Sequence, residues 1–179
     1  NMDGSYTYIL SENADQSGGA VSDDFTVRVT DATGDTTGDK TLAINILDDV
    51  PQATDDTNSV AEGLGNTTTG DVDGGTEAST GDAADVYGAD GSGGIVGVAV
   101  GDTNTAITNG TGVSSAVAGT YGTLTVLADG SYTYALTAAA VPSAAAADVF
   151  TYTIVDGEGD PSTATVTIAV NQDTNYPVI

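Results

Sequence analysis

The segment Asp156-Gly157-Glu158-Gly159-Asp160 places three carboxylates at alternate positions, with glycines between them. Calcium takes about six to eight oxygen ligands at about 2.3–2.6 Å, and carboxylates are the commonest of these. The glycines let the backbone fold so that alternate acids converge on one centre. The segment is not an EF-hand, because the twelve-residue spacing and the closing Glu are missing. We therefore predict a calcium loop of another type here.

Three further acidic clusters extend this prediction. Asp31-Ala32-Thr33-Gly34-Asp35 keeps the two outer acids but has Thr33 in the middle, so we expect it to bind calcium more weakly. Acids on both sides of Pro51 predict a site at a domain junction, where a cation would restrict bending, and a glycine-rich loop between Asp71 and Asp90 is the third candidate. The candidate ligands of the junction, the loop and the C-terminal end are Asp48, Asp49, Asp55, Asp56, Asp82, Asp85, Asp90 and Asp173. The alternative is that these acids are solvated turn residues or an adaptation to high salt.

The charge balance limits the possible functions. Only Arg28 and Lys40 oppose 26 acidic residues, giving a net charge of -24, and 22 of the acids are Asp, which favours turns over helices. The carboxylates repel one another, and salt or bound cations are needed to offset this repulsion. The negative charge also excludes nucleic acid, a polyanion, as a partner. The chain has no Cys, His or Trp, which excludes transition-metal sites and Cys or His catalysis. We predict that the protein is not an enzyme, and no apolar run is long enough for membrane insertion.

The chain contains an internal repeat. Asp3-Gly-Ser-Tyr-Thr-Tyr8 recurs as Asp129-Gly-Ser-Tyr-Thr-Tyr134, and the segments that begin at Phe25 and Phe150 also match. These matches predict the back half of one repeat at 1–50, a linker at 51–57, a complete repeat at 58–173 and the start of another linker at 174–179. The front half of the first repeat is expected from upstream sequence or, as the alternative, from strands of a neighbouring molecule.

The secondary structure is expected to be almost entirely strand. Apolar residues alternate with polar ones, which is typical of strands with one buried face. About seven short strands in the complete repeat, joined by Gly- and Asp-rich turns, predict an all-β, antiparallel, immunoglobulin-like sandwich. A tight hairpin is expected around Asp129-Gly130. The buried faces are expected at Tyr6, Tyr8, Leu10, Phe25, Val27 and Val29, and at their counterparts in the complete repeat.

Five segments resemble the VCBS and cadherin-like repeats of giant RTX adhesins: Asp48–Ala53, Asp85–Gly91, Asp129–Tyr134, Phe150–Asp160 and Thr163–Val170. The resemblance implies tandem extender domains, type I secretion to the bacterial surface, calcium near domain junctions, and a role in attachment and biofilm. One departure is Gln172, which stands where the first repeat has Asp48, and it puts a full ligand set at the downstream junction in doubt.

The expected partners are neighbouring repeats of the same chain and possibly other copies of it. Two alternative functions remain open. One is a self-assembling extracellular fibre subunit completed by strands of a neighbour. The other is a module that binds a sugar or a protein through the 66–94 loop.

Overall fold

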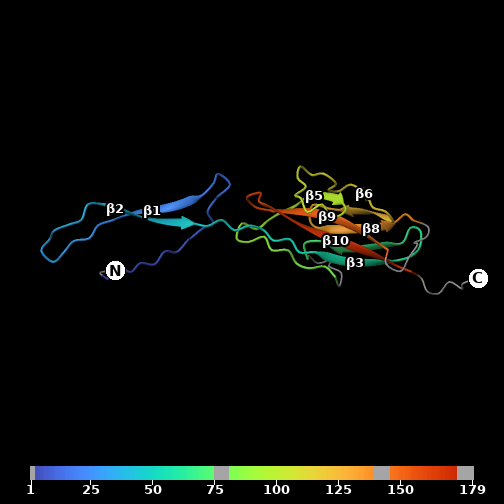
Figure 1. Cartoon of the computed structure of the whole chain (residues 1–179), viewed down its shortest axis with the longest axis horizontal. Helices are drawn as coiled ribbons and strands as arrows, with labels where there is room; N and C mark the ends of the chain where they lie inside the picture. The colour runs from blue at the N-terminus through green and yellow to red at the C-terminus, as the bar shows by residue number, and fades with distance from the viewer. Residues whose placement is uncertain (1–2, 75–80, 139–145, 173–179) are drawn as a thin grey trace, which may run out of the picture. The chain divides into compact units, whose positions relative to one another are not determined.

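The computed structural model describes residues 3–74, 81–138 and 146–172, and its regular secondary structure consists of strands (Figure 1). The chain forms two compact units, Asn1–Asp49 and Val50–Ile179. None of the described segments forms a helix long and apolar enough to cross a membrane. The all-β prediction is confirmed.

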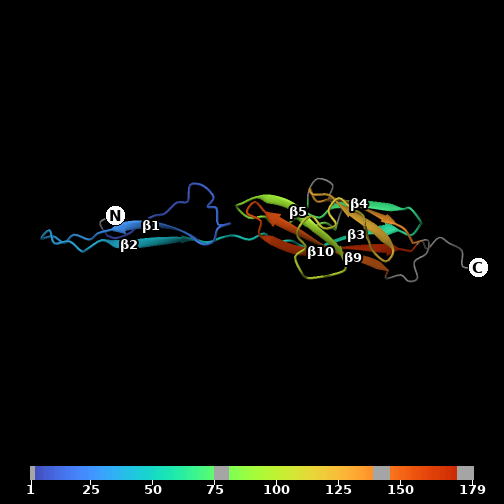
Figure 2. The same cartoon turned by 90° about the horizontal axis from the view of Figure 1, so that it is seen from above.

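The second unit is a sandwich of two four-stranded sheets (Figure 2). The sheets have the strand orders β3-β10-β9-β5 and β4-β8-β7-β6, and every pairing is antiparallel except the parallel pair of β3 and β10. The strands are β3 (Asp56–Ala61), β4 (Thr67–Asp71), β5 (Ser92–Val100), β6 (Val117–Ala118), β7 (Gly122–Val126), β8 (Ser131–Leu136), β9 (Ala147–Asp156) and β10 (Pro161–Asn171).

One hydrophobic core lies between the two sheets, and the alternation of the sequence builds it. Val166, Ile168 and Val170 of β10 are at most 1% exposed, whereas Thr167 and Ala169 between them are partly exposed. Tyr134 of β8 meets Phe150 of β9 edge to face across the core, with ring centroids 6.3 Å apart. This is the immunoglobulin-like arrangement that the period of two predicts.

The β7–β8 hairpin also forms as predicted. Gly130 has a φ of +89°, and the Asp129 carboxylate accepts hydrogen bonds from the Ser131 backbone N–H and hydroxyl. Only glycine adopts that backbone conformation without strain, so the Asp-Gly pair fixes the turn.

The first unit pairs β1 (Val21–Val27) with β2 (Lys40–Ile46), and here the predicted core is wrong. Phe25, Val27 and Val29 are 45%, 42% and 66% exposed. Residues 5–10, which were expected to form a strand, do not form one. The physical reason is the same for both: among the described residues of this unit, no second sheet covers the apolar face or pairs with residues 5–10.

Two segment boundaries also differ from expectation. Part of the predicted 66–94 loop is β4, and β5 already begins at Ser92. β3 begins at Asp56, which lies inside the predicted linker and is only 1% exposed. Asp56 is therefore an interior residue of the sandwich.

Candidate metal centre

Asp56 and Asp85 come together around one tyrosine hydroxyl. The hydroxyl of Tyr152, on β9, lies 3.0 Å from Asp56 Oδ2, 3.3 Å from Asp85 Oδ1 and 2.8 Å from the Thr54 carbonyl oxygen. Asp56 Oδ1 also accepts from the Ala83 N–H at 2.7 Å, and Asp85 Oδ1 accepts from the Thr54 N–H at 2.7 Å. The start of β3 and the segment before β5 thus bring two carboxylates to the same buried place.

These two carboxylates have fewer hydrogen-bond donors than their oxygens can accept from. A hydroxyl carries one proton, so Tyr152 donates to only one of its three acceptors at a time. Asp85 Oδ2 is buried and has no hydrogen-bond partner. A buried carboxylate without full hydrogen bonding is costly unless it takes up a proton or binds a cation.

The pKa values of the two carboxyls also show that burial disfavours their charged forms. The pKa of Asp56 is raised to about 7, chiefly by burial; hydrogen bonds from Ala83 and Tyr152 oppose this shift, and the nearby charges of Asp85 and Asp82 add to it. Burial likewise raises the pKa of Asp85 to about 6, and the charge of Asp71 adds to the shift. Each carboxyl therefore holds a proton well above the usual pKa of an aspartate, unless a cation replaces that proton.

No side chain of the second unit can supply that cation. Both basic residues, Arg28 and Lys40, belong to the first unit, whereas residues 50–179 contain 16 acids and no Lys, Arg or His. Arg28 forms an exposed ion pair with Asp39. The second unit therefore has no basic side chain of its own to neutralise Asp56 and Asp85.

Asp82 and Asp71 continue the acidic region. Asp82 Oδ2 accepts from the Asp71 N–H at 3.0 Å, and the Tyr132 hydroxyl lies 3.3 Å from Asp82 Oδ1. Asp71 is 5% exposed, and its Oδ1 accepts from the Asp73 N–H at 3.1 Å. Asp71 and Asp73 were not among the predicted ligands, although their place in the predicted loop marked the region.

The donor set fits a hard cation such as calcium. Asp85 offers an unpartnered oxygen, Asp56 offers a second carboxylate, and the Thr54 carbonyl lies beside the same hydroxyl. In the described part of the second unit, no three carboxylates bring ligand oxygens within 4.8 Å of one another. Backbone carbonyls and water would therefore have to complete the coordination shell, as they commonly do for calcium.

In the Asp156–Asp160 turn, one carboxylate oxygen accepts hydrogen bonds from the backbone of the turn itself. Asp156 Oδ1 accepts from the N–H groups of Glu158, Gly159 and Asp160 at 2.9–3.1 Å. Asp156 Oδ2 is buried without a partner, in a side chain that is 2% exposed, and Glu158 and Asp160 are partly exposed. The turn thus keeps one orphaned oxygen that a cation would satisfy, while its other oxygen has a structural role.

The Asp31–Asp35 turn has the same form. Asp31 Oδ1 accepts from the Asp35 N–H at 2.9 Å and from the Thr33 hydroxyl at 2.7 Å, and the latter bond lowers the pKa of Asp31. All five residues of this turn are exposed. The weaker calcium binding predicted here stays a prediction.

Of the other predicted ligands, Asp55 and Asp90 neighbour different segments of the second unit. Asp55 Oδ1 bonds the Thr165 N–H and hydroxyl instead. Asp90 adjoins the Asp156–Asp160 turn, because the Gly157 N–H donates to the Gly91 carbonyl at 2.9 Å. Asp48 and Asp49 close the first unit, so the junction site stays a prediction, and Asp173 lies outside the described residues.

Asp148 is an important carboxylate that the sequence analysis missed. It is 3% exposed and accepts from the N–H groups of Thr120, Tyr121 and Gly122 at 2.7–3.3 Å, and from the Tyr134 hydroxyl at 2.7 Å. A side chain at Gly119 would collide with it. Because its donors surround it, Asp148 needs no cation. The only sequence signal was its position two residues before Phe150, as Asp23 precedes Phe25.

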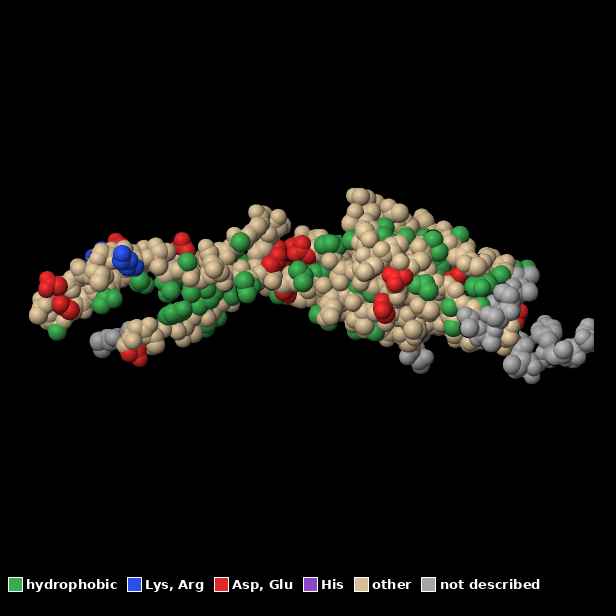
Figure 3. Space-filling model, viewed as in Figure 1, with side chains coloured by type: hydrophobic (Ala, Val, Ile, Leu, Met, Phe, Trp, Pro, Cys, Tyr) green, Lys and Arg blue, Asp and Glu red, His purple; other side chains and the backbone are tan. Residues whose placement is uncertain are grey.

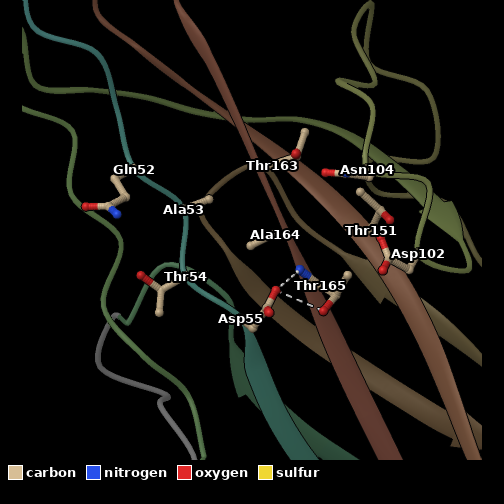
Figure 4. A pocket seen from close by; sticks show the side chains of 10 residues that line it. All are labelled: Gln52, Ala53, Thr54, Asp55, Asp102, Asn104, Thr151, Thr163, Ala164 and Thr165. Carbon is tan, nitrogen blue, oxygen red and sulfur yellow. Dashed lines mark hydrogen bonds between the residues drawn. The ribbon is translucent and has the colours of Figure 1, made fainter.

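A shallow polar groove of about 490 Å³ lies beside β10 (Figure 4). Its lining is dominated by hydroxyl, amide and carboxylate groups, from Thr151, Thr163, Thr165, Asn104, Asp102 and Asp55 among others. Among the described residues, none from the 66–94 loop lines the groove, and the lining includes no aromatic side chain on which a sugar ring could stack.

Comparison with known proteins gives the family. No match was found among curated proteins. The family of bacterial cadherin-like domains matches residues 48–172, which includes all the described strands of the second unit. Such a domain is a structural, adhesion-type extracellular repeat rather than an enzyme fold. The chain belongs to the bacterial cadherin-like domain family.

Proposed function

We propose that the chain is a structural extender segment of a large secreted bacterial surface adhesin, stiffened by calcium, which supports attachment and biofilm. The observation that carries this proposal is the buried pair Asp56 and Asp85, which has an orphaned oxygen and no basic residue anywhere in its unit. Calcium from the medium would neutralise the pair and tie the start of β3 to the segment before β5.

The path of the chain through the second unit supports an extender role. The chain enters beside the start of β10, where the Ala53 N–H donates to the Ser162 hydroxyl at 2.9 Å. It leaves at the end of β10, where the Glu62 N–H donates to the Asn171 carbonyl at 2.8 Å. β10 has 11 residues and thus spans about 35 Å. A repeat that is entered at one end and left at the other adds its length to a string of repeats.

Calcium also explains how such a chain would be exported and then become rigid. A cation that binds only the folded state stabilises it, so folding is favoured where calcium is plentiful. In a calcium-poor cytosol the acids of the second unit would repel one another and weaken the fold. Secretion by a type I system is consistent with this order of events.

A calorimetric titration of the full chain with calcium chloride tests the site. We expect Asp85→Asn and Asp56→Asn each to weaken binding about tenfold or more, because each removes a charged ligand. Asp102→Asn is the matched control, since it removes the same charge from an exposed residue. Equal affinity in all four proteins, or an equal loss in all three variants, would overturn the assignment.

Small-angle scattering of a tandem array of the 50–172 repeat tests the mechanical role. We expect the array to be longer and stiffer in calcium than in chelator at the same ionic strength. An array with the same dimensions in both conditions would refute stiffening by calcium while leaving any binding at Asp56 and Asp85 intact.

A further inference from the structure

The first unit has a turn at Asp3–Ser5 with the geometry of the turn between β7 and β8. Ser5 donates its N–H and its hydroxyl to Asp3 Oδ1 at 2.9 and 2.7 Å, and Gly4 has a φ of +81°. The same bonds and a similar φ fix the turn at Asp129–Ser131, which joins β7 to β8. Such a turn places the strand before it beside the strand after it.

The strands of the first unit also have the register of the second unit. Phe25 of β1 faces Leu42 of β2, as Phe150 of β9 faces Val166 of β10. Asp23 faces Ile44, as Asp148 faces Ile168. The two pairs of strands are therefore equivalent, residue for residue.

The contacts of the side chains match as well. The Tyr8 hydroxyl donates to Asp23 at 2.7 Å, as the Tyr134 hydroxyl donates to Asp148 at 2.7 Å. Tyr8 meets Phe25 edge to face at 6.2 Å, as Tyr134 meets Phe150 at 6.3 Å. The first unit thus carries the inner lining of a sandwich.

The difference between the units is what covers this lining. Tyr134 and Phe150 are 0% exposed, whereas Phe25 is 45% exposed and Tyr8 is half-buried. Hydrophobic side chains lie open along the first unit (Figure 3). In the second unit β8 lies between β4 and β7, and β9 lies between β10 and β5. The first unit has no counterpart of β4, β5 or β7 among its described residues.

We propose that the apolar face of residues 5–46 is the open half of a second sandwich, and that a segment equivalent to residues 54–126 covers it, joined covalently through the Asp3–Ser5 turn. We call this segment the front half of a repeat. It would supply the counterparts of β3 to β7, pair with residues 5–10 and bury Phe25.

A second copy of the chain is a poorer occupant than a covalently joined front half. The front half of each copy is already used in its own second unit, where Val98 of β5 is 1% exposed and Leu124 of β7 is 0% exposed. Releasing it would expose that core. The Asp3–Ser5 turn, in contrast, is already shaped to receive a strand on its N-terminal side.

A chimaera tests the proposal on the full chain. Residues 50–128 are duplicated and fused directly ahead of Asp3, so that the duplicated Ala128 precedes Asp3 as the native Ala128 precedes Asp129. Hydrogen exchange of the peptide that contains residues 5–10 is then measured, and residues 131–136 of the same molecule serve as the benchmark. Ile9 and Ala135 distinguish the two peptides by mass. We expect residues 5–10 to exchange rapidly in the parent chain and to reach the protection of β8 in the chimaera.

Two variants of the chimaera make the result decisive. Val27 stands where the second unit has the larger Tyr152, so Val27→Tyr is added to fill the space if the first chimaera packs poorly. Leu124→Asp in the duplicated copy alone is the control, and we expect it to abolish the protection. Rapid exchange of residues 5–10 both in the first chimaera and in the chimaera with Val27→Tyr would overturn the proposal. Protection that rises with the concentration of the parent chain would also overturn it, in favour of a second copy.

Discussion

At the scale of single residues, two kinds of buried carboxylate occur in the same sandwich. Asp148 is surrounded by donors, with three backbone N–H groups and one hydroxyl. Asp56 and Asp85 share one hydroxyl, and an oxygen of Asp85 has no partner. The hydrogen bonds of Asp148 give it a structural role, whereas the pair Asp56 and Asp85 needs a proton or a cation. The number of donors, and not burial alone, separates the two roles.

Asp148→Asn is expected to lower the free energy of unfolding by about 1.5–3 kcal/mol, because the amide cannot accept from all the donors that meet the carboxylate. Tyr134→Phe removes a single donor and should cost about 1 kcal/mol. Urea denaturation in calcium measures both, with Asp102→Asn as the exposed control. A cost for Asp148→Asn no larger than that of the control would show that the carboxylate does not hold the 119–122 turn.

The raised pKa values of Asp56 and Asp85 predict an unusual pH dependence in chelator. The folded chain keeps protons on these groups up to about pH 7 and about pH 6, whereas unfolded carboxyls lose theirs near pH 4. The folded state therefore binds more protons over this window, and the free energy of unfolding falls as the pH rises from about 4 to about 7.

Urea midpoints measured at several pH values in this window test that sign. Asp56→Asn should flatten the curve, because it removes the group with the higher pKa, and calcium should reduce the loss by replacing the protons. A free energy of unfolding that increases with pH in chelator would contradict the interpretation of the pair.

At the scale of strands, the same sequence pattern has different energetic consequences in the two units. Phe150 and Phe25 occupy equivalent positions in equivalent strand pairs, yet one is 0% and the other 45% exposed. We expect Phe150→Ala to cost about 3–5 kcal/mol, as for a buried aromatic residue. Phe25→Ala should cost less than about 1 kcal/mol, because its face is open. Calorimetric unfolding of both variants measures the difference, and equal costs would show that the face of the first unit is covered.

Most of the strand architecture could be predicted from the sequence because alternation is a local property. The sandwich class, the β7–β8 hairpin and the buried faces of β8, β9 and β10 all follow from it. Exposure of Phe25 could not be predicted in this way, because it depends on whether another sheet is present. Residues 5–10 show the same limit, since strand residues without a pairing partner do not form a strand.

The candidate site was predictable only in part. Acids before β5 pointed to the right region, but Asp56 was assigned to a linker, since nothing local showed that the chain packs there against Tyr152. Asp85 and Asp56 meet through contacts between residues far apart in the sequence. Asp148 was missed because a single Asp among apolar residues gives no signal of the four donors around it.

At the scale of the whole molecule, we propose that the acids destabilise the repeat when calcium is absent and make it rigid when calcium is bound. Sixteen acids without a basic residue repel one another in the second unit, and the sandwich tolerates them where donors or cations are available. Because the chain enters and leaves this unit at opposite ends of β10, the unit adds its length to the chain.

Thermal unfolding of the full chain, in calcium and in chelator at equal ionic strength, shows whether a divalent cation stabilises the second unit. With calcium at about a hundredfold excess over its dissociation constant, we expect the melting temperature of the second unit to rise by roughly 10 °C. Magnesium at the same concentration should raise it less, since it tolerates irregular coordination poorly. Superimposable melts in calcium and chelator would contradict the claim that Asp56 and Asp85 are held together by a divalent cation.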